Sequence, residues 1–202
     1  MAFIGAKPTN VPLTSADIQD GTINTADIAD GAVTSVKTTG VGGTNTPAFQ
    51  AYLNSDQSVS NGAFTKVTVA GESFDTAGCY NNTGSTVTLN GISTPSYSFA
   101  PNVAGKYSIY GKIYMGSSSN YDYRYGYVRI NKNGSEVDWC MLNLDMGSNN
   151  GTEMTAVCTS VVNMNGTSDY LDLYGLLAVG SGTPKFKSGV FRTGFGAYKI
   201  IE

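Results

Sequence analysis

The sequence contains no histidine, and only 13% of its residues are charged. Without histidine there is no Ser-His-Asp or Cys-His nucleophilic system and no histidine-ligated zinc site. No stretch of about 20 apolar residues occurs, so we expect no membrane-spanning segment. The net charge of −3 argues against the clustered basic surface that nucleic acid requires.

Catalytic motifs are scarce as well. There is no Gly-rich phosphate loop ending in Gly-Lys-Ser/Thr, no Cys-x-x-Cys pair and no dinucleotide fingerprint between a strand and a helix. The carboxylates of Asp169 and Asp172 could in principle serve a glycosidase, but such residues more often lie on solvated surfaces. We therefore predict that the chain is not an enzyme and carries no cofactor or metal.

The three cysteines, Cys79, Cys140 and Cys158, are widely spaced and odd in number, so they cannot all pair within one chain. We expect them to be small buried apolar residues. Glycine, with 25 copies, and tyrosine, with 13, are abundant, and this composition suits short strands and tight turns. An all-β fold is the prediction.

Residues 44–202 are predicted to form one head domain. Alternation of apolar and polar residues predicts strands at 64–69, 107–115, 123–130, 170–177 and 195–201. In the second of these, Tyr107, Ile109, Ile113 and Met115 share one face. Asn133-Gly134 is a strong hairpin turn signal. Many short strands bounded by turns indicate a sandwich or a barrel.

Tyrosines occupy every second position of one predicted strand: Tyr121, Tyr123, Tyr125 and Tyr127. Because side chains alternate along a strand, we expect all four rings on one face. Such a row suits either the buried face between subunits of a trimer or a platform for glycan stacking, and we favour the trimer. Trp139 is expected in the core, with an exposed binding contact as the alternative.

Residues 13–43 are predicted to form a repeat shaft that ends in a Gly-rich hinge. Aliphatic residues recur at every fifth position: Leu13, Ile18, Ile23, Ile28 and Val33. Residues 15–23 return at 25–33, which is a true internal repeat. A period of five fits neither a helix nor a plain strand, so each unit should make an extended step and then a turn. Three chains around a common axis could bury these aliphatics in layers, which one chain cannot do.

Two alternatives stay open for the shaft. A segment of low hydrophobicity that finds no partner would remain a disordered linker, because it could not offset its ordering entropy. A pentapeptide-type β-helix would explain the small residues two positions before each aliphatic, although so few repeats stack little more than one coil.

Residues 1–12 contain Phe3, Ile4, Pro8 and Pro12 without enough apolar bulk for a core of their own. We predict that they are an anchor segment that orders only against a partner. The two prolines favour an extended path. The run of about 7–15 apolar residues that a secretory signal requires does not occur there, so we expect no export by this route.

Short motifs of the head occur in a characteristic order: Pro47–Tyr52, Tyr80–Gly84, Phe99–Tyr107, Val128–Gly134 and Phe191–Tyr198. In this order they resemble the globular-head domain of complement component one-q and its tumour-necrosis-factor relatives. The resemblance implies a ten-strand jelly roll that trimerises and serves recognition. Residues 85–98 depart from the family, which has almost nothing between the two flanking motifs. Some members bind calcium, but no loop of the EF-hand kind supports such a site here.

The stretch Ala-Asp-Ile-Ala-Asp-Gly-Ala-Val at 26–33 resembles the repeats of marine bacteriophage fibre proteins, especially those of cyanophages. Phe3-Ile4-Gly5 followed by Pro8 resembles the opening of such proteins. The combined resemblance implies a virion structural protein, a short trimeric fibre made in the host cytoplasm and located on the virion surface. It is an analogy of architecture.

Three functions are compatible with these observations. The first is a tail fibre or receptor-binding tip, with host-surface glycan or protein as its partner. The second is a capsid head fibre or decoration protein that docks on shell subunits through the same anchor. The third is a secreted lectin-like binding protein, against which the lack of a signal segment counts. Other virion proteins at the N-terminus and the chain's own copies are the expected partners, with neither nucleic acid nor a membrane among them.

Overall fold

The computed structural model describes Thr14 and residues 18–19, 21–33, 45–117, 123–143 and 153–200. The chain divides into two units, residues 1–42 and residues 43–202, and each is described by itself. Within the described ranges, no helix has the length and apolar character needed to cross a membrane.

The two copies of the repeat close the same turn. Backbone hydrogen bonds of 3.1 Å and 2.9 Å close the turns Gln19–Thr22 and Ala29–Ala32, ten residues apart. The third residue of each turn is glycine, Gly21 with a φ of 79° and Gly31 with a φ of 77°. A type II turn requires this left-handed conformation, which strains other residues. The turn predicted at each Asp-Gly pair is present.

Between the two turns lies the short 3-10 helix η2 (Thr25–Asp27). The backbone N–H of Asn24 donates to the Asp27 carboxylate at 2.9 Å, which holds the start of this helix. The aliphatic side chains stay exposed in the single chain: Ile18 44%, Ile23 55%, Ile28 42% and Val33 53%. Leu13 lies outside the described residues. The described part of the repeat therefore has no core of its own.

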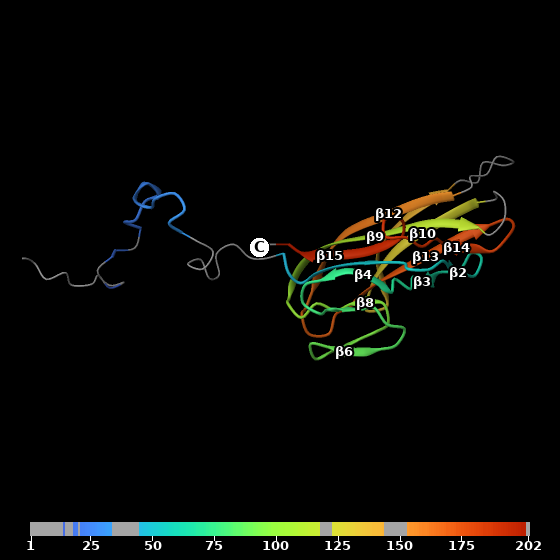
Figure 1. The fold of residues 1–202 in the computed structure, drawn as a ribbon, viewed down its shortest axis with the longest axis horizontal. Coiled ribbons are helices and arrows are strands. Elements are labelled where there is room, and N and C mark those ends of the chain that lie inside the picture. The colour runs from blue at the N-terminus through green and yellow to red at the C-terminus, as the bar shows by residue number, and fades with distance from the viewer. Residues whose placement is uncertain are drawn as a thin grey trace, which may run out of the picture. The chain divides into compact units, whose positions relative to one another are not determined.

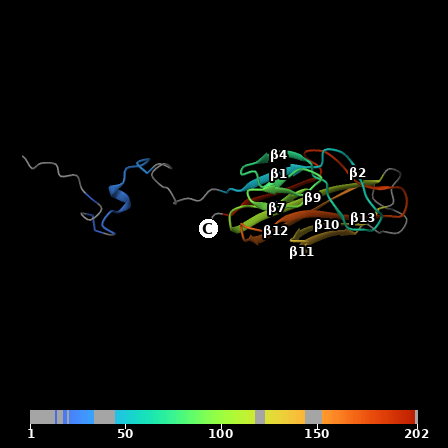
Figure 2. The same cartoon turned by 90° about the horizontal axis from the view of Figure 1, so that it is seen from below.

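The head is built from two antiparallel sheets (Figure 1). Hydrophobic side chains fill the space between them. The seven-stranded sheet contains β2 (Gln57–Ser58), β14 (Pro184–Phe186), β9 (Gly105–Ser117), β15 (Gly194–Lys199), β1 (Ala48–Tyr52) and β4 (Gly71–Asp75) in this order, with β12 (Glu153–Met164) paired to β9. The six-stranded sheet contains β11 (Ser135–Asn143), β10 (Tyr123–Lys132), β13 (Leu171–Val179), β8 (Ser98–Phe99) and β5 (Tyr80–Asn81), with β3 (Thr65–Lys66) paired to β13. Figure 2 shows β1 and β4 on one side of the head and β10, β11 and β13 on the other.

The pairing of the strands is nested. The first strand pairs with the last, β1 with β15, and β8 pairs with β13. Inside these pairs, β9 pairs with β12 and β10 with β11. A chain folded in half and wrapped in this way into two sheets is a jelly roll. The prediction of an all-β jelly-roll head is confirmed.

The core follows from the alternation along β9. Tyr107, Ile109, Ile113 and Met115 are all buried, as predicted. Phe99 and Phe195 belong to the same hydrophobic core. Leucine, isoleucine and aromatic side chains from both sheets thus fill the space between them, which supplies most of the driving force for folding.

The hairpin of β10 and β11 turns at the predicted place. Asn133 and Gly134 have φ angles of 53° and 80°. Positive φ at both central residues defines a type I′ turn, whose twist matches that of the flanking strands.

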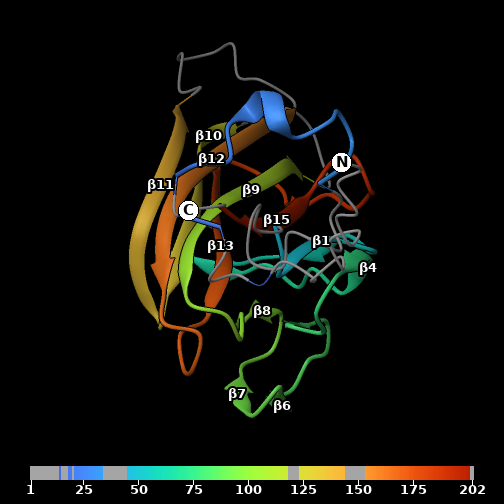
Figure 3. The same ribbon diagram turned by 90° about the vertical axis from the view of Figure 1, so that its left-hand side faces the viewer.

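The extra segment at residues 85–98 forms a hairpin of β6 (Val87–Leu89) and β7 (Ile92–Thr94), a separate two-stranded sheet. Figures 1 and 3 both show it beside the main sandwich. The buried Asn81 side chain holds its base, because its amide donates to the carbonyl oxygens of Ser85, Thr94 and Pro95. The departure from the resembled family is therefore an added element that leaves the jelly roll intact.

Candidate functional site

A β-bulge divides the predicted row of tyrosines. The register between β10 and β13 shifts between Tyr123 and Tyr125, so β10 has one residue more than β13 at this point. An extra residue turns the following side chains to the opposite face. Tyr123 is 0% exposed in the core, whereas Tyr125 and Tyr127 are half-buried. The expectation of one shared face is wrong at Tyr123, and Tyr121 lies outside the described residues.

Aromatic rings gather instead on the outward surface of the six-stranded sheet. We call this surface the aromatic face; its side chains are Phe64, Tyr125, Tyr127, Arg129, Trp139 and Tyr174. Tyr127 is at the centre, with its ring centroid 5.7 Å from that of Phe64, 6.0 Å from that of Tyr125 and 5.6 Å from that of Trp139. The Tyr125 and Phe64 rings meet Tyr127 edge to face. Such pairs fix ring orientation and add to the energy of burial.

Arg129 lies among these rings. Its guanidinium carbon is 3.9 Å from the centroid of Phe64 and 5.3 Å from that of Tyr174. Its Nη1 also approaches a carboxylate oxygen of Glu136 at 3.5 Å. The Arg129 Nε is enclosed and has no hydrogen-bond partner among the residues that the structure describes. Cation–π attraction to the two ring faces offsets part of the resulting cost.

Cross-strand register builds the aromatic face. Arg129 lies opposite Trp139 on β11 and opposite Tyr174 on β13, so the three form one row across the sheet. Trp139 is 50% exposed, and its expected place in the core is therefore wrong. The sequence does not indicate this, because β11 is apolar on both faces. Its inward residues include Cys140 and Leu142, and its outward residues include Trp139.

The seven-stranded sheet has an outward surface of a different kind. We call it the flat face, formed by Tyr52, Tyr110, Thr155, Val157, Thr159 and Val161. The ring of Tyr52 lies against Gly71 and that of Tyr110 against Gly196, where an added Cβ would clash with the ring. On β12 the outward residues alternate threonine and valine, and no charged residue occurs from Met154 to Met164. Along β12 this surface is uncharged from Met154 to Met164, while Lys112 of β9 lies opposite Val157 and donates to the Phe191 carbonyl.

The carboxylates considered for catalysis are held in separate ion pairs. Asp172 pairs with Lys66 at 2.9 Å, and the Lys66 ammonium also donates to the Ser98 hydroxyl at 3.0 Å. Burial raises the pKa of Asp172, against the opposing effect of Lys66. Asp169 pairs with Lys132 at 2.8 Å. The two carboxyl groups thus have different cationic partners and form no acid–base pair in the described structure.

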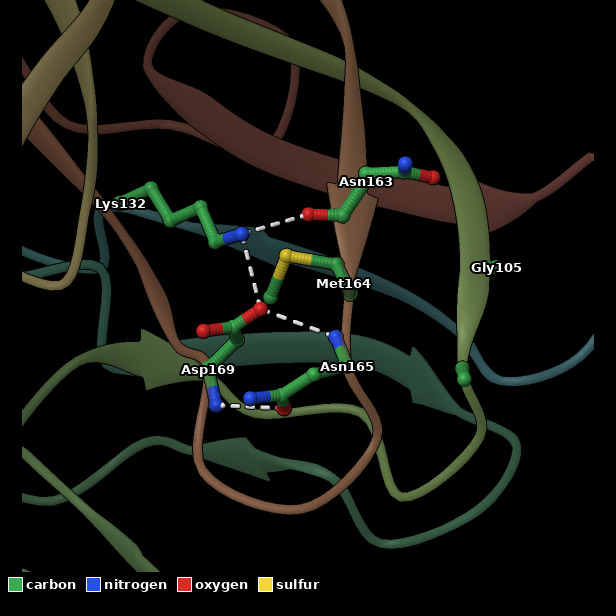
Figure 4. A pocket seen from close by; sticks show the side chains of 7 residues that line it. Gly105, Lys132, Asn163, Met164, Asn165 and Asp169 are labelled. Carbon is green, nitrogen blue, oxygen red and sulfur yellow. Dashed lines mark hydrogen bonds and ion pairs between the residues drawn. The ribbon is translucent and has the colours of Figure 1, made fainter.

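The ion pair of Lys132 and Asp169 borders a small open pocket of about 340 Å³ (Figure 4). Lys132 also donates to the Asn163 carbonyl at 2.7 Å, and Asp169 accepts from the Asn165 backbone and the Asn133 amide. Burial would raise the pKa of Asp169, but these hydrogen bonds and Lys132 together lower it. The pocket's charged groups satisfy one another, and their role is to fasten the β12–β13 connection to the β10–β11 hairpin.

The predicted residues thus have different outcomes. The anchor residues Phe3, Ile4, Pro8 and Pro12, together with the shaft residue Leu13, lie outside the described residues. Within the described ranges, no group of three or more His, Cys, Asp or Glu side chains is placed to hold a metal ion. The three cysteines are free thiols, with Cys79 and Cys158 buried as expected and Cys140 half-buried.

The fold defines a jelly-roll head, and comparison with known proteins adds the following. No protein-family model matches the chain, and no curated protein sequence matches it either. Similar solved structures include the Eiger TNF of S. frugiperda, with 14% identity over 77% of this chain and 92% of that one and a TM-score of 0.46. Murine APRIL has 10% identity over 76% and 98%, with a TM-score of 0.49. The globular domain of zebrafish complement 1qA has 12% identity over 77% and 98%, with a TM-score of 0.47.

These neighbours are of the tumour-necrosis-factor and complement type to which the head motifs pointed. The jelly-roll assignment itself stands on the strand pairing of this chain. The resemblance of the repeat to phage fibre proteins stays a prediction.

Proposed function

We propose that the chain is a bacteriophage virion structural protein, a short trimeric fibre whose head serves recognition and not catalysis. Its place is the tail, as a tail fibre or receptor-binding tip. The observation that carries the proposal is the exposure of every described aliphatic of the repeat, from 42% to 55% in a single chain. Isolated apolar residues with a strict spacing and no core of their own require a partner with the same spacing.

Further copies of the same chain meet this requirement. In a three-chain assembly around one axis, Ile18, Ile23, Ile28 and Val33 would each form a layer of three side chains. Burial of these side chains would then offset the entropy cost of ordering the segment. The glycine turns at Gly21 and Gly31 support a regular stack, because they recur after ten residues, the spacing of every second layer.

The head supplies a second contact between chains. The flat face exposes Val157 and Val161 on a strand of 12 residues that has no charge along most of its length. A long, flat and uncharged edge strand invites association unless it is covered. A neighbouring head would cover it, which leaves the aromatic face outward. This arrangement favours the glycan alternative for Tyr125 and Tyr127 over the trimer alternative.

Attachment to the capsid, as a head fibre or decoration protein, is the second candidate. Both attachments use the same anchor segment, and the repeat would hold the head away from the particle in either case. Immunogold labelling of intact virions against the head separates them. Label at the tail supports the proposal, and label over the shell supports the alternative.

Substitution of the shaft tests the assembly. Ile23→Asp together with Ile28→Asp would place three carboxylates in each of two axial layers, so we expect the trimer to dissociate at micromolar concentration. Thr25→Asp with Ala29→Asp adds the same charge to the same repeat, but at positions outside the five-residue period of large aliphatics. This control variant should leave the trimer intact. Light scattering measures the number of chains per particle. A wild-type monomer, or equal behaviour of the two double variants, would contradict the axial packing.

A further inference from the structure

We propose that the aromatic face binds a saccharide, with pyranose rings stacked on Tyr127, Trp139 and Phe64. The inference rests on the proposed recognition role of the head, and it adds the chemical class of the ligand and the surface that receives it.

The side chains of the aromatic face match the chemistry of a sugar. A pyranose presents C–H groups on its two faces and hydroxyl groups around its rim. The rings of Tyr127 and Trp139 offer surfaces on which the C–H groups can pack. Arg129, which is opposite Trp139 on the neighbouring strand, and Glu136, which is paired with Arg129, offer a donor and an acceptor for the hydroxyl groups, and both retain exposed side-chain area. The aromatic face therefore supplies both kinds of contact that a sugar makes: ring surfaces for its C–H groups and hydrogen-bonding groups for its hydroxyls.

The rings are held in place before a ligand arrives. Tyr127 lies on β10, between β11 and β13, and it contacts three other rings. The Arg129 guanidinium is stacked on Phe64. Rigid aromatic side chains lose little conformational entropy on binding, which suits weak and repeated contacts with a polysaccharide. Trp139 remains half exposed at the edge of this cluster, where a ligand can reach it.

The chain provides its own reporter, because Trp139 is its one tryptophan. The full chain is applied to an array of bacterial surface polysaccharides and titrated with cellohexaose, maltohexaose and chitohexaose while tryptophan emission is followed. We expect at least one of these glycans to bind and to shift the emission. Tyr127→Ala should weaken binding about tenfold, as loss of one stacking ring implies. Trp139→Ala, read on the array, should do the same. Phe191→Ala removes an exposed ring outside the aromatic face and should bind as the wild type does.

Three results would overturn the inference. The first is no binding on the array together with no emission change for the three oligosaccharides at millimolar concentration. The second is equal binding by wild type and by a folded Tyr127→Ala variant. The third is protection of Trp139 from iodide quenching in the assembled protein without sugar, which would show that another chain covers the aromatic face. Chain number and virion incorporation are measured separately, so a failure of the proposed fibre role is distinguishable from a failure of saccharide binding.

Discussion

Tyr107 shows at the scale of one residue how the core is held. It is 0% exposed, its ring meets that of Phe99 edge to face at 5.8 Å, and its hydroxyl donates to the Val103 carbonyl at 2.8 Å. Tyr107→Ala should destabilise the head by about 3–5 kcal/mol because it leaves a large cavity. Tyr107→Phe keeps the ring and should cost only about 1 kcal/mol for the hydrogen bond. Urea denaturation measures both, and near-equal losses would contradict the cavity argument.

Asp169 predicts how stability depends on pH. Its pKa is lowered in the folded head, so its contribution is fully present well above the unfolded pKa of about 3.9 and is lost as pH falls through the lower pKa of the folded state. We expect the free energy of unfolding to drop as pH falls below about 5, and the drop to be smaller in Asp169→Asn. Denaturation series across this range measure the slope. An unchanged slope in the variant would assign the acid sensitivity to other groups.

Single residues also show what the sequence could and could not predict. The burial of Tyr107, Ile109, Ile113 and Met115 was predictable. On a strand with one buried face, alternation places all the apolar side chains on that face. The position of Tyr123 was not, because a bulge depends on how β13 pairs and leaves no local signal. The contact of Trp139 with Tyr127 arises from pairing of two strands whose register the sequence does not state.

At the scale of elements, turns were more predictable than insertions. The type I′ turn at Asn133-Gly134 follows from residues that accept positive φ. The β6–β7 hairpin has two strands of three residues each, too short to give a periodic pattern, and it depends on the distant Asn81 for its position.

Strand β12 allows a test of whether two heads associate through the flat face. Val157→Lys together with Val161→Lys would bury lysines between heads if the flat face packs against another copy, so the assembly should weaken without loss of the head fold. Both side chains are about half exposed in the single chain, which is why folding should tolerate the change. Val103→Lys, on an exposed loop residue, is the control. Sedimentation velocity at several concentrations measures association. If the double variant assembles as tightly as the control, the chains meet elsewhere.

At the scale of the whole molecule, the order of segments predicts a polarity, with attachment at the N-terminal end and recognition in the head. Deletion of residues 2–12 should leave a folded trimer that no longer joins virions. Replacement of Tyr127 and Trp139 by alanine should leave incorporation intact and reduce adsorption to host cells. Copy number per particle, measured by quantitative mass spectrometry, decides the first part. A truncated chain present at the normal copy number would place the anchor elsewhere.

The identical turns at Gly21 and Gly31 have a consequence for how such a protein can change over generations. Because the glycine turn and the aliphatic spacing both recur after ten residues, a duplication or loss of one ten-residue block would leave the remaining glycines and aliphatics at their regular spacing. In the proposed fibre, the length of the shaft would then change in whole repeats. A single genetic event would lengthen or shorten the reach from the particle, while the head and the predicted anchor segment keep their sequences.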